Sequence, residues 1–104
     1  MKFADRLHEV RIKRGITQKE LARRMKIKAP VLSRYERNES KPSIEVATNL
    51  AINLNVSLDY LVGISNWEGE GAFRKKWQRV MKLTEADKGH VSFYMDILLK
   101  ARER

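Results

Sequence analysis

The chain has 104 residues, 34% of them charged, no cysteine and a formal net charge of +9. This length allows one compact domain or a small domain with an extension, and the lack of cysteine excludes disulfides, thiolate metal sites and cysteine nucleophiles. No apolar stretch approaches the roughly 20 residues of a membrane span, and the first ten residues lack the apolar run of an export signal. We therefore expect a cytoplasmic protein with no membrane partner.

The basic charge is concentrated in one part of the chain. Residues 19–41 hold eight lysines and arginines against three glutamates, whereas residues 42–73 hold four acidic residues and no lysine or arginine. A basic excess favours polyanions such as nucleic acid. The abrupt change of charge at Pro42 favours a binding face over a surface that is only solvated.

Apolar residues recur at helical spacing along the chain, without the alternation of a strand. The first expected helix presents Phe3, Leu7 and Val10 on one face and ends near Gly15. This periodicity predicts an all-α protein.

Two short helices follow, at 18–25 and 29–37. Thr17 can cap the first of them. Pro30 lies in the first turn of the second, where the N–H that proline lacks has no intrahelical partner. Because a residue before proline avoids the α region, we expect Ala29 to be the cap-side residue and Pro30 the first helical one.

The next two helices begin at serines. Ser43 can cap a fourth helix, and Ser57 can cap a short fifth helix that Gly63 ends. Residues 64–71, ISNWEGEG, have two glycines and no periodicity, which predicts a linker. The sequence thus predicts a five-helix domain at 1–63 and, after this linker, a helical extension at 72–104.

The last expected helix runs from about residue 85 to 102 and is capped by Thr84. It is apolar on more sides than one chain can cover. We expect a homodimer interface here, although an intramolecular cap on the domain is the alternative. The predicted seam consists of Val91, Tyr94, Leu98 and Ala101.

Catalysis and metal binding lack support in the sequence. Neither His8 nor His90 has a second histidine or a paired acid at ligand spacing, and Ser33 and Ser92 lack a plausible base. We expect no enzyme activity, no metal and no cofactor.

A long string carries a family resemblance. Residues 14–63, RGITQKELARRMKIKAPVLSRYERNESKPSIEVATNLAINLNVSLDYLVG, closely resemble the Cro/lambda-repressor-like helix-turn-helix family, also called XRE-type. The shared motifs are TQ-x-ELA in the second helix, LSRYE in the third, KPS before the fourth and NVSLDYLV at the fifth. The resemblance implies an all-α, five-helix lambda-repressor-like DNA-binding domain, here with a helical C-terminal extension.

The resemblance also implies roles for individual residues. The side chains expected to read bases are Ala29, Pro30, Ser33 and Arg34. The side chains expected to contact phosphates are Gln18, Lys28, Asn38 and Lys41. Arg11 and Glu36 match a structural salt bridge. Among the readers only Arg34 is a strong hydrogen-bond donor, and a guanidinium suits guanine O6 and N7.

Two positions depart from the family pattern. Lys26 stands where a glycine often follows the second helix, and that position can require a positive φ. Asn38 stands near the end of the third helix, where the family favours Asn-Gly. Asparagine tolerates the left-handed conformation, so we expect the helix still to stop there.

The resemblance implies a sequence-specific regulator that binds double-stranded DNA, most simply a dimeric repressor on a pseudo-palindromic operator. One alternative is an antitoxin, which would use the C-terminal helices to bind a toxin protein. Another is a protein-interaction module that uses the fold without reading DNA. The change of charge at Pro42 argues against the last.

Overall fold

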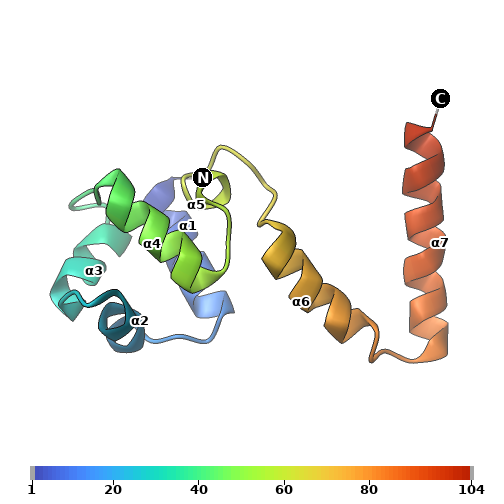
Figure 1. Cartoon of the computed structure of the whole chain (residues 1–104), viewed down its shortest axis with the longest axis horizontal. Coiled ribbons are helices and arrows are strands. Elements are labelled where there is room, and N and C mark those ends of the chain that lie inside the picture. Colours follow the sequence, from blue (N-terminus) through green and yellow to red (C-terminus); the bar gives the residue numbers. More distant parts are fainter. Residues whose placement is uncertain (1, 104) are drawn as a thin grey trace. The chain divides into compact units, whose positions relative to one another are not determined.

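The computed structural model describes residues 2–103 and contains helices but no strand in that range (Figure 1). The all-α prediction is confirmed. The chain divides into two compact units after Ala72. The helices are α1 (Phe3–Lys13), α2 (Gln18–Met25), α3 (Ala29–Glu36), α4 (Ile44–Leu54), α5 (Leu58–Leu61), α6 (Glu70–Val80) and α7 (Glu85–Arg102).

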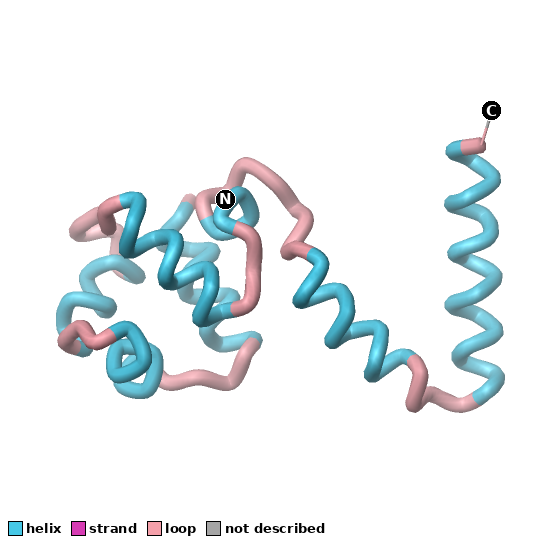
Figure 2. The backbone as a smooth tube through the Cα atoms, in the orientation of Figure 1, coloured by secondary structure: helices cyan, strands magenta, loops and turns pink. Residues whose placement is uncertain are grey.

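The first unit is built around one apolar core to which each of the helices α1–α5 contributes. The side chains with no exposed surface are Leu7, Val10, Leu21, Leu32, Leu50, Leu54 and Leu61. Burying each leucine contributes about 1.5–3 kcal/mol relative to leaving it in water. Short loops join these five helices (Figure 2), so the core fixes how α2 and α3 are presented.

Hydroxyl caps begin three of these helices, as the sequence predicts. The side-chain oxygens of Thr17, Ser43 and Ser57 each accept a hydrogen bond from the N–H three residues later, at 3.0, 3.2 and 3.1 Å. Each cap satisfies an amide that has no partner within its own helix. The starts of α2, α4 and α5 are therefore set by local chemistry.

Left-handed residues end three elements of the first unit. Lys26 has φ 58°, Asn38 has φ 60° and Asn55 has φ 56°. The expectation of a positive φ at Lys26 is confirmed, and so is the stop at Asn38. Asparagine adopts this conformation more readily than most residues, whereas a lysine carries the full steric cost of its Cβ.

The segment 64–71 differs from the linker that the sequence predicts, because it is hydrogen-bonded to the first unit. The carboxylate of Glu68 accepts from Lys13 at 2.7 Å and from Arg14 at 3.2 Å, and its backbone carbonyl accepts from Ser57 N–H. In addition, α6 begins inside the segment, at Glu70. Composition gave no sign of these contacts, because their partners lie 11 to 55 residues away.

The second unit contains most of α6 and all of α7. Thr84 caps α7 by accepting from the N–H of Asp87 at 3.2 Å, as predicted. No residue of α7 is buried, and its large apolar side chains remain exposed. This helix is therefore stabilised by its own backbone and cap, without a core.

Candidate nucleic-acid interface

The turn between α2 and α3 is compact. Lys26 ends α2 in the left-handed conformation, and the N–H of Ile27 donates to the carbonyl of Ala22 at 3.0 Å. Ile27 packs against the core. Lys28 then has extended backbone and precedes the first residue of α3. Hydrogen bonding and packing of the turn thus fix the connection between α2 and α3.

The start of α3 corrects one prediction. The helix begins at Ala29 and Lys28 is the cap, so Pro30 is the second helical residue rather than the first. The N–H of Val31 donates to the carbonyl of Lys28 at 3.0 Å. Proline at either of the first two positions costs no intrahelical hydrogen bond, and its effect on the preceding residue is a preference that this turn overrides.

The two sides of α3 differ in burial. Leu32 has no exposed surface, and Ala29 and Tyr35 pack partly buried against the core. Pro30 and Arg34 are exposed, and Ser33, the last of the predicted readers, is half-buried. The exposed side of α3 thus combines one apolar ring with one guanidinium, and it is free to enter a groove.

Arg34 is the strongest potential reader on this side. Within residues 2–103 its side chain has no hydrogen bond and no ion pair. Its neighbour Arg37 instead binds Glu39, with 2.6 Å between Nε and Oε2. Arg34 therefore keeps all its donors for a ligand, and the geometry of a guanidinium matches a guanine edge.

The predicted phosphate contacts fall into two groups. Lys28, Asn38 and Lys41 are exposed and lie on the loops at the two ends of α3. Gln18 is half-buried at the start of α2, and its side chain helps to lower the pKa of Glu36. The three exposed side chains are accessible to DNA phosphates, whereas the side chain of Gln18 is only partly accessible.

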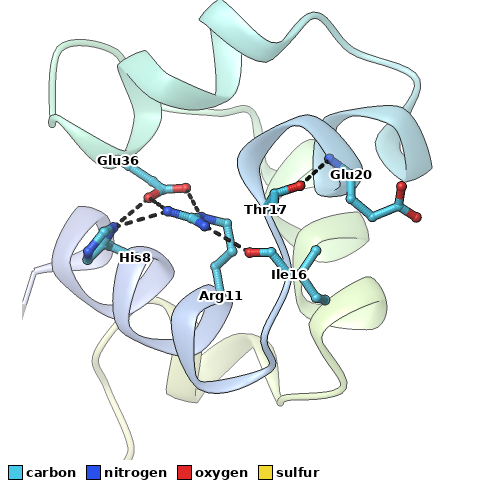
Figure 3. A network of polar contacts seen from close by, with 6 residues as sticks. All are labelled: His8, Arg11, Ile16, Thr17, Glu20 and Glu36. Carbon is cyan, nitrogen blue, oxygen red and sulfur yellow. Dashed lines mark hydrogen bonds and ion pairs between the residues drawn. The ribbon is translucent and has the colours of Figure 1, made fainter.

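An ion pair fixes α1 against α3. Arg11 binds both oxygens of Glu36, at 2.7 and 3.0 Å, and also donates to the carbonyl of Ile16 at 2.8 Å. Figure 3 shows the guanidinium between these two acceptors. The two charged side chains are only 9% and 3% exposed. A buried bidentate pair of this kind constrains orientation as well as charge.

His8 joins the same network. Its Nδ1 lies 2.7 Å from Oε1 of Glu36 (Figure 3), although the ring is 57% exposed. Burial raises the pKa of Glu36, but hydrogen bonds from Arg11, His8 and Gln18 outweigh it, so the pKa lies below its ordinary value. The sequence gave no signal for His8, because its partner lies 28 residues away.

The basic stretch also contains cations that are already paired. Arg23 and Arg24 both bind Glu20, at 2.6 and 3.0 Å. These hydrogen bonds lower the pKa of Glu20 to about 2. Net charge alone therefore overstates the number of cations at 19–41 that are available to a ligand.

No cluster of three or more histidine or acidic side chains that could hold a metal occurs among residues 2–103. Within the same range no helix is long and apolar enough to cross a membrane. The predicted seam residues Val91, Tyr94, Leu98 and Ala101 lie on α7 and none of them is buried.

Comparison with known proteins decides the family. Residues 7–61, more than half of the chain, match the family model described as helix-turn-helix. The chain belongs to the XRE-type helix-turn-helix family. The matched residues include both helices of the turn, the core beneath them and the Arg11–Glu36 pair.

Two relatives are named as transcriptional regulators. The chain is 43% identical over 63 residues to ImmR of Bacillus subtilis and 37% identical over 65 residues to DdrOP3 of Deinococcus deserti. These matches cover 61% and 62% of the chain. The matched part spans about half the length of either relative, at 50% of each.

A solved structure agrees with the fold. The complex of the proteins SinR and SinI contains a chain that aligns with a TM-score of 0.58 and 21% identity, over 94% of this chain and 98% of that one. At this identity the similarity concerns the fold.

Proposed function

We propose that the protein is a transcriptional regulator that binds a specific sequence of double-stranded DNA through α3. The observation that carries the proposal is Arg34, an exposed guanidinium without a protein partner among residues 2–103, on a helix whose other side is anchored by the buried Leu32. Family membership and relatives named as regulators support it.

In this proposal the first turn of α3 contributes little hydrogen bonding. Ala29 and Pro30 offer apolar contact to thymine methyl groups, and Ser33 assists Arg34. Lys28, Asn38 and Lys41 bind phosphates on either side of the groove and set the position of α3. Gln18 contributes one phosphate contact from the start of α2.

We further propose that the protein acts as a dimer and represses transcription by occupying a promoter. Tyr94 and Leu98 are 62% and 46% exposed on α7, and an apolar surface of this kind is commonly an interface. Two copies would present two α3 helices about 34 Å apart, which requires a pseudo-palindromic operator.

Selection of bound duplexes from a random pool tests DNA reading directly. We expect a motif with two related half-sites one helical turn apart. Recovery of no preferred sequence would reject specific binding, and a motif with a single half-site would reject the dimer on DNA.

The variant Arg34→Ala tests whether Arg34 is the side chain that recognises a base. On the selected duplex it should weaken binding by about 1–3 kcal/mol and relax the preference at one base pair. Lys28→Ala is the matched control, because loss of a phosphate contact weakens all sequences alike. If Arg34→Ala behaves like the control, Arg34 is a phosphate contact and base reading by α3 is not supported.

An antitoxin is the second candidate, because the exposed side chains of α7 would equally bind a different protein. The SinR chain occurs in a complex with a second protein, SinI. Light scattering of the purified chain at micromolar concentration separates the candidates. A homodimer supports the first proposal, whereas a monomer that co-purifies stoichiometrically with a small protein from its source supports the antitoxin.

A further inference from the structure

A second set of unpaired cations lies outside the helix-turn-helix. Residues 71–84 contain five lysines and arginines and no acidic residue. They are Arg74, Lys75, Lys76, Arg79 and Lys82, and all of them are exposed. Within residues 2–103, none of the five forms an ion pair or a side-chain hydrogen bond.

Three of these cations form one row. Lys75 and Arg79 are one turn apart on α6, and Lys82 follows three residues later. The helix α6 ends at Val80, and Lys82 lies in the turn that follows, where its N–H donates to the carbonyl of Arg79 at 3.1 Å. These three residues are called the basic row, Lys75–Arg79–Lys82, and at 1.5 Å per residue its two helical members lie about 6 Å apart along α6.

The basic row contrasts with the paired cations of the first unit. There Glu20, Glu36, Glu39 and Glu68 each bind at least one arginine. In the basic row like charges stand at helical neighbour spacing and repel one another. A cationic surface without its own counter-charges is suited to a polyanion.

A short length of chain tethers the basic row to the DNA-binding unit. Ala72, in the first turn of α6, is buried in the first unit, and Gly71 lies against the side chain of Asn55. Lys82 is ten residues beyond Ala72, and the first eight of these residues belong to α6. When the first unit is on DNA, the local concentration of phosphates around the basic row is therefore high.

We propose that the basic row binds the phosphate backbone of the duplex that flanks the operator. This inference rests on the proposed function, because it needs the first unit on DNA. An anionic membrane is the competing ligand for a basic amphipathic helix. Phe73, Trp77 and Met81 are 50%, 37% and 51% exposed, so binding to vesicles is measured beside binding to DNA. The short tether from the basic row to the DNA-binding unit is the observation that favours the duplex.

The test compares two duplexes with the same selected operator. One ends at the edge of the operator, and the other extends by about one helical turn, roughly 10 base pairs, on each side. Binding of the full chain is measured by fluorescence anisotropy over a range of salt concentrations. We expect tighter binding to the extended duplex, with the slope of log K against log salt steeper by about 0.9 for each added phosphate contact.

Two triple variants separate the basic row from net charge. Lys75→Gln, Arg79→Gln and Lys82→Gln together should abolish the gain from the flanks and leave binding to the short duplex unchanged. The control removes three charges from α7 through Lys88→Gln, Lys100→Gln and Arg102→Gln, and should keep the gain. Circular dichroism checks that both variants retain their helices.

Three results would overturn the inference. One is the absence of any gain on the extended duplex, and another is an equal loss in both triple variants. The third is loss of binding to phosphatidylglycerol vesicles in the basic-row variant while its gain on the extended duplex persists. If selection recovers no operator, the proposed function fails separately. The two variants are then compared on mixed-sequence duplexes of both lengths. If both variants bind each duplex with the same affinity, the proposal that the basic row binds phosphates is rejected.

Discussion

The two units of the chain use their apolar residues in opposite ways. In the first unit, leucines from every helix are completely buried in one core. In α7 of the second unit, Phe93, Leu98 and Leu99 remain 68%, 46% and 59% exposed. A domain that has buried its own leucines needs no partner to fold, whereas a helix that has not done so depends on what covers it.

The largest expected effect comes from breaking the buried ion pair of the first unit. Glu36→Ala leaves the guanidinium of Arg11 without its carboxylate, and we expect a loss of about 3–5 kcal/mol in the free energy of unfolding. Glu39→Ala breaks the exposed pair with Arg37 and should cost less than about 1 kcal/mol. Urea unfolding followed by circular dichroism measures both, and equal losses would contradict the contrast in burial.

Truncating one leucine in each unit tests the comparison directly. Leu50→Ala leaves a cavity in the core and should lower the free energy of unfolding of the first unit by about 2–5 kcal/mol. Leu98→Ala should leave that unfolding transition unchanged in dilute solution. If Leu98→Ala lowers the transition as much as Leu50→Ala, the apolar side of α7 is covered within its own chain.

Acid should act on the first unit chiefly through its two partly buried carboxylates, because the exposed pairs of Glu20 are screened by solvent. Burial raises the pKa values of Glu36 and Glu68, but hydrogen bonds from Arg11 and His8 to the former, and from Lys13 and Arg14 to the latter, lower both below the ordinary 4.5. A lowered native pKa means that the stabilisation is complete above pH 4.5 and is lost as the pH falls through the native values.

Unfolding free energies measured between pH 7 and pH 3 check this expectation. Stability should decline below about pH 4.5 in the native chain. Glu36→Gln cannot lose a charge, so its decline should be shallower, from a lower starting value. An equally steep decline in this variant would assign the acid sensitivity to other groups.

The smallest expected effects come from exchanging glycine in each unit. Lys26→Gly relieves a left-handed lysine and should stabilise the first unit by about 0.5–1 kcal/mol, after the extra entropy of glycine in the unfolded chain is subtracted. Gly89→Ala, where a Cβ meets nothing within 4 Å, should favour α7 by about 1 kcal/mol. The first change should raise the urea midpoint, and the second should appear only as increased helicity.

Local chemistry made much of the fold predictable. Thr17, Ser43, Ser57 and Thr84 were identified as caps because a cap and the amide it binds lie three residues apart. The positive φ of Lys26 followed from the turn that the family requires. The start of α3 was misplaced by one residue, because the proline rule is a bias among conformations that packing can override.

Polar contacts between residues far apart in the chain could not be predicted from the sequence. The pairing of Arg11 with Glu36 came from family resemblance alone, and the approach of His8 to the same carboxylate had no signal at all. The contacts of Glu68 with Lys13 and Arg14 were missed for the same reason, since they join residues more than 50 positions apart. Hydrophobic periodicity reports which side of a helix is buried, but not which charged groups meet across helices.

The contacts of Glu68 also bear on where a minimal DNA-binding fragment should end. A fragment that stops at Gly63 would lose the carboxylate that binds Lys13 and Arg14, the acceptor for the Ser57 amide and the buried Ala72. A fragment that ends after Val80, the last residue of α6, keeps all of these contacts and leaves that helix intact. Domain swaps and fusions made from this protein would therefore join best after Val80, 17 residues later than the domain end at Gly63 that the sequence predicts.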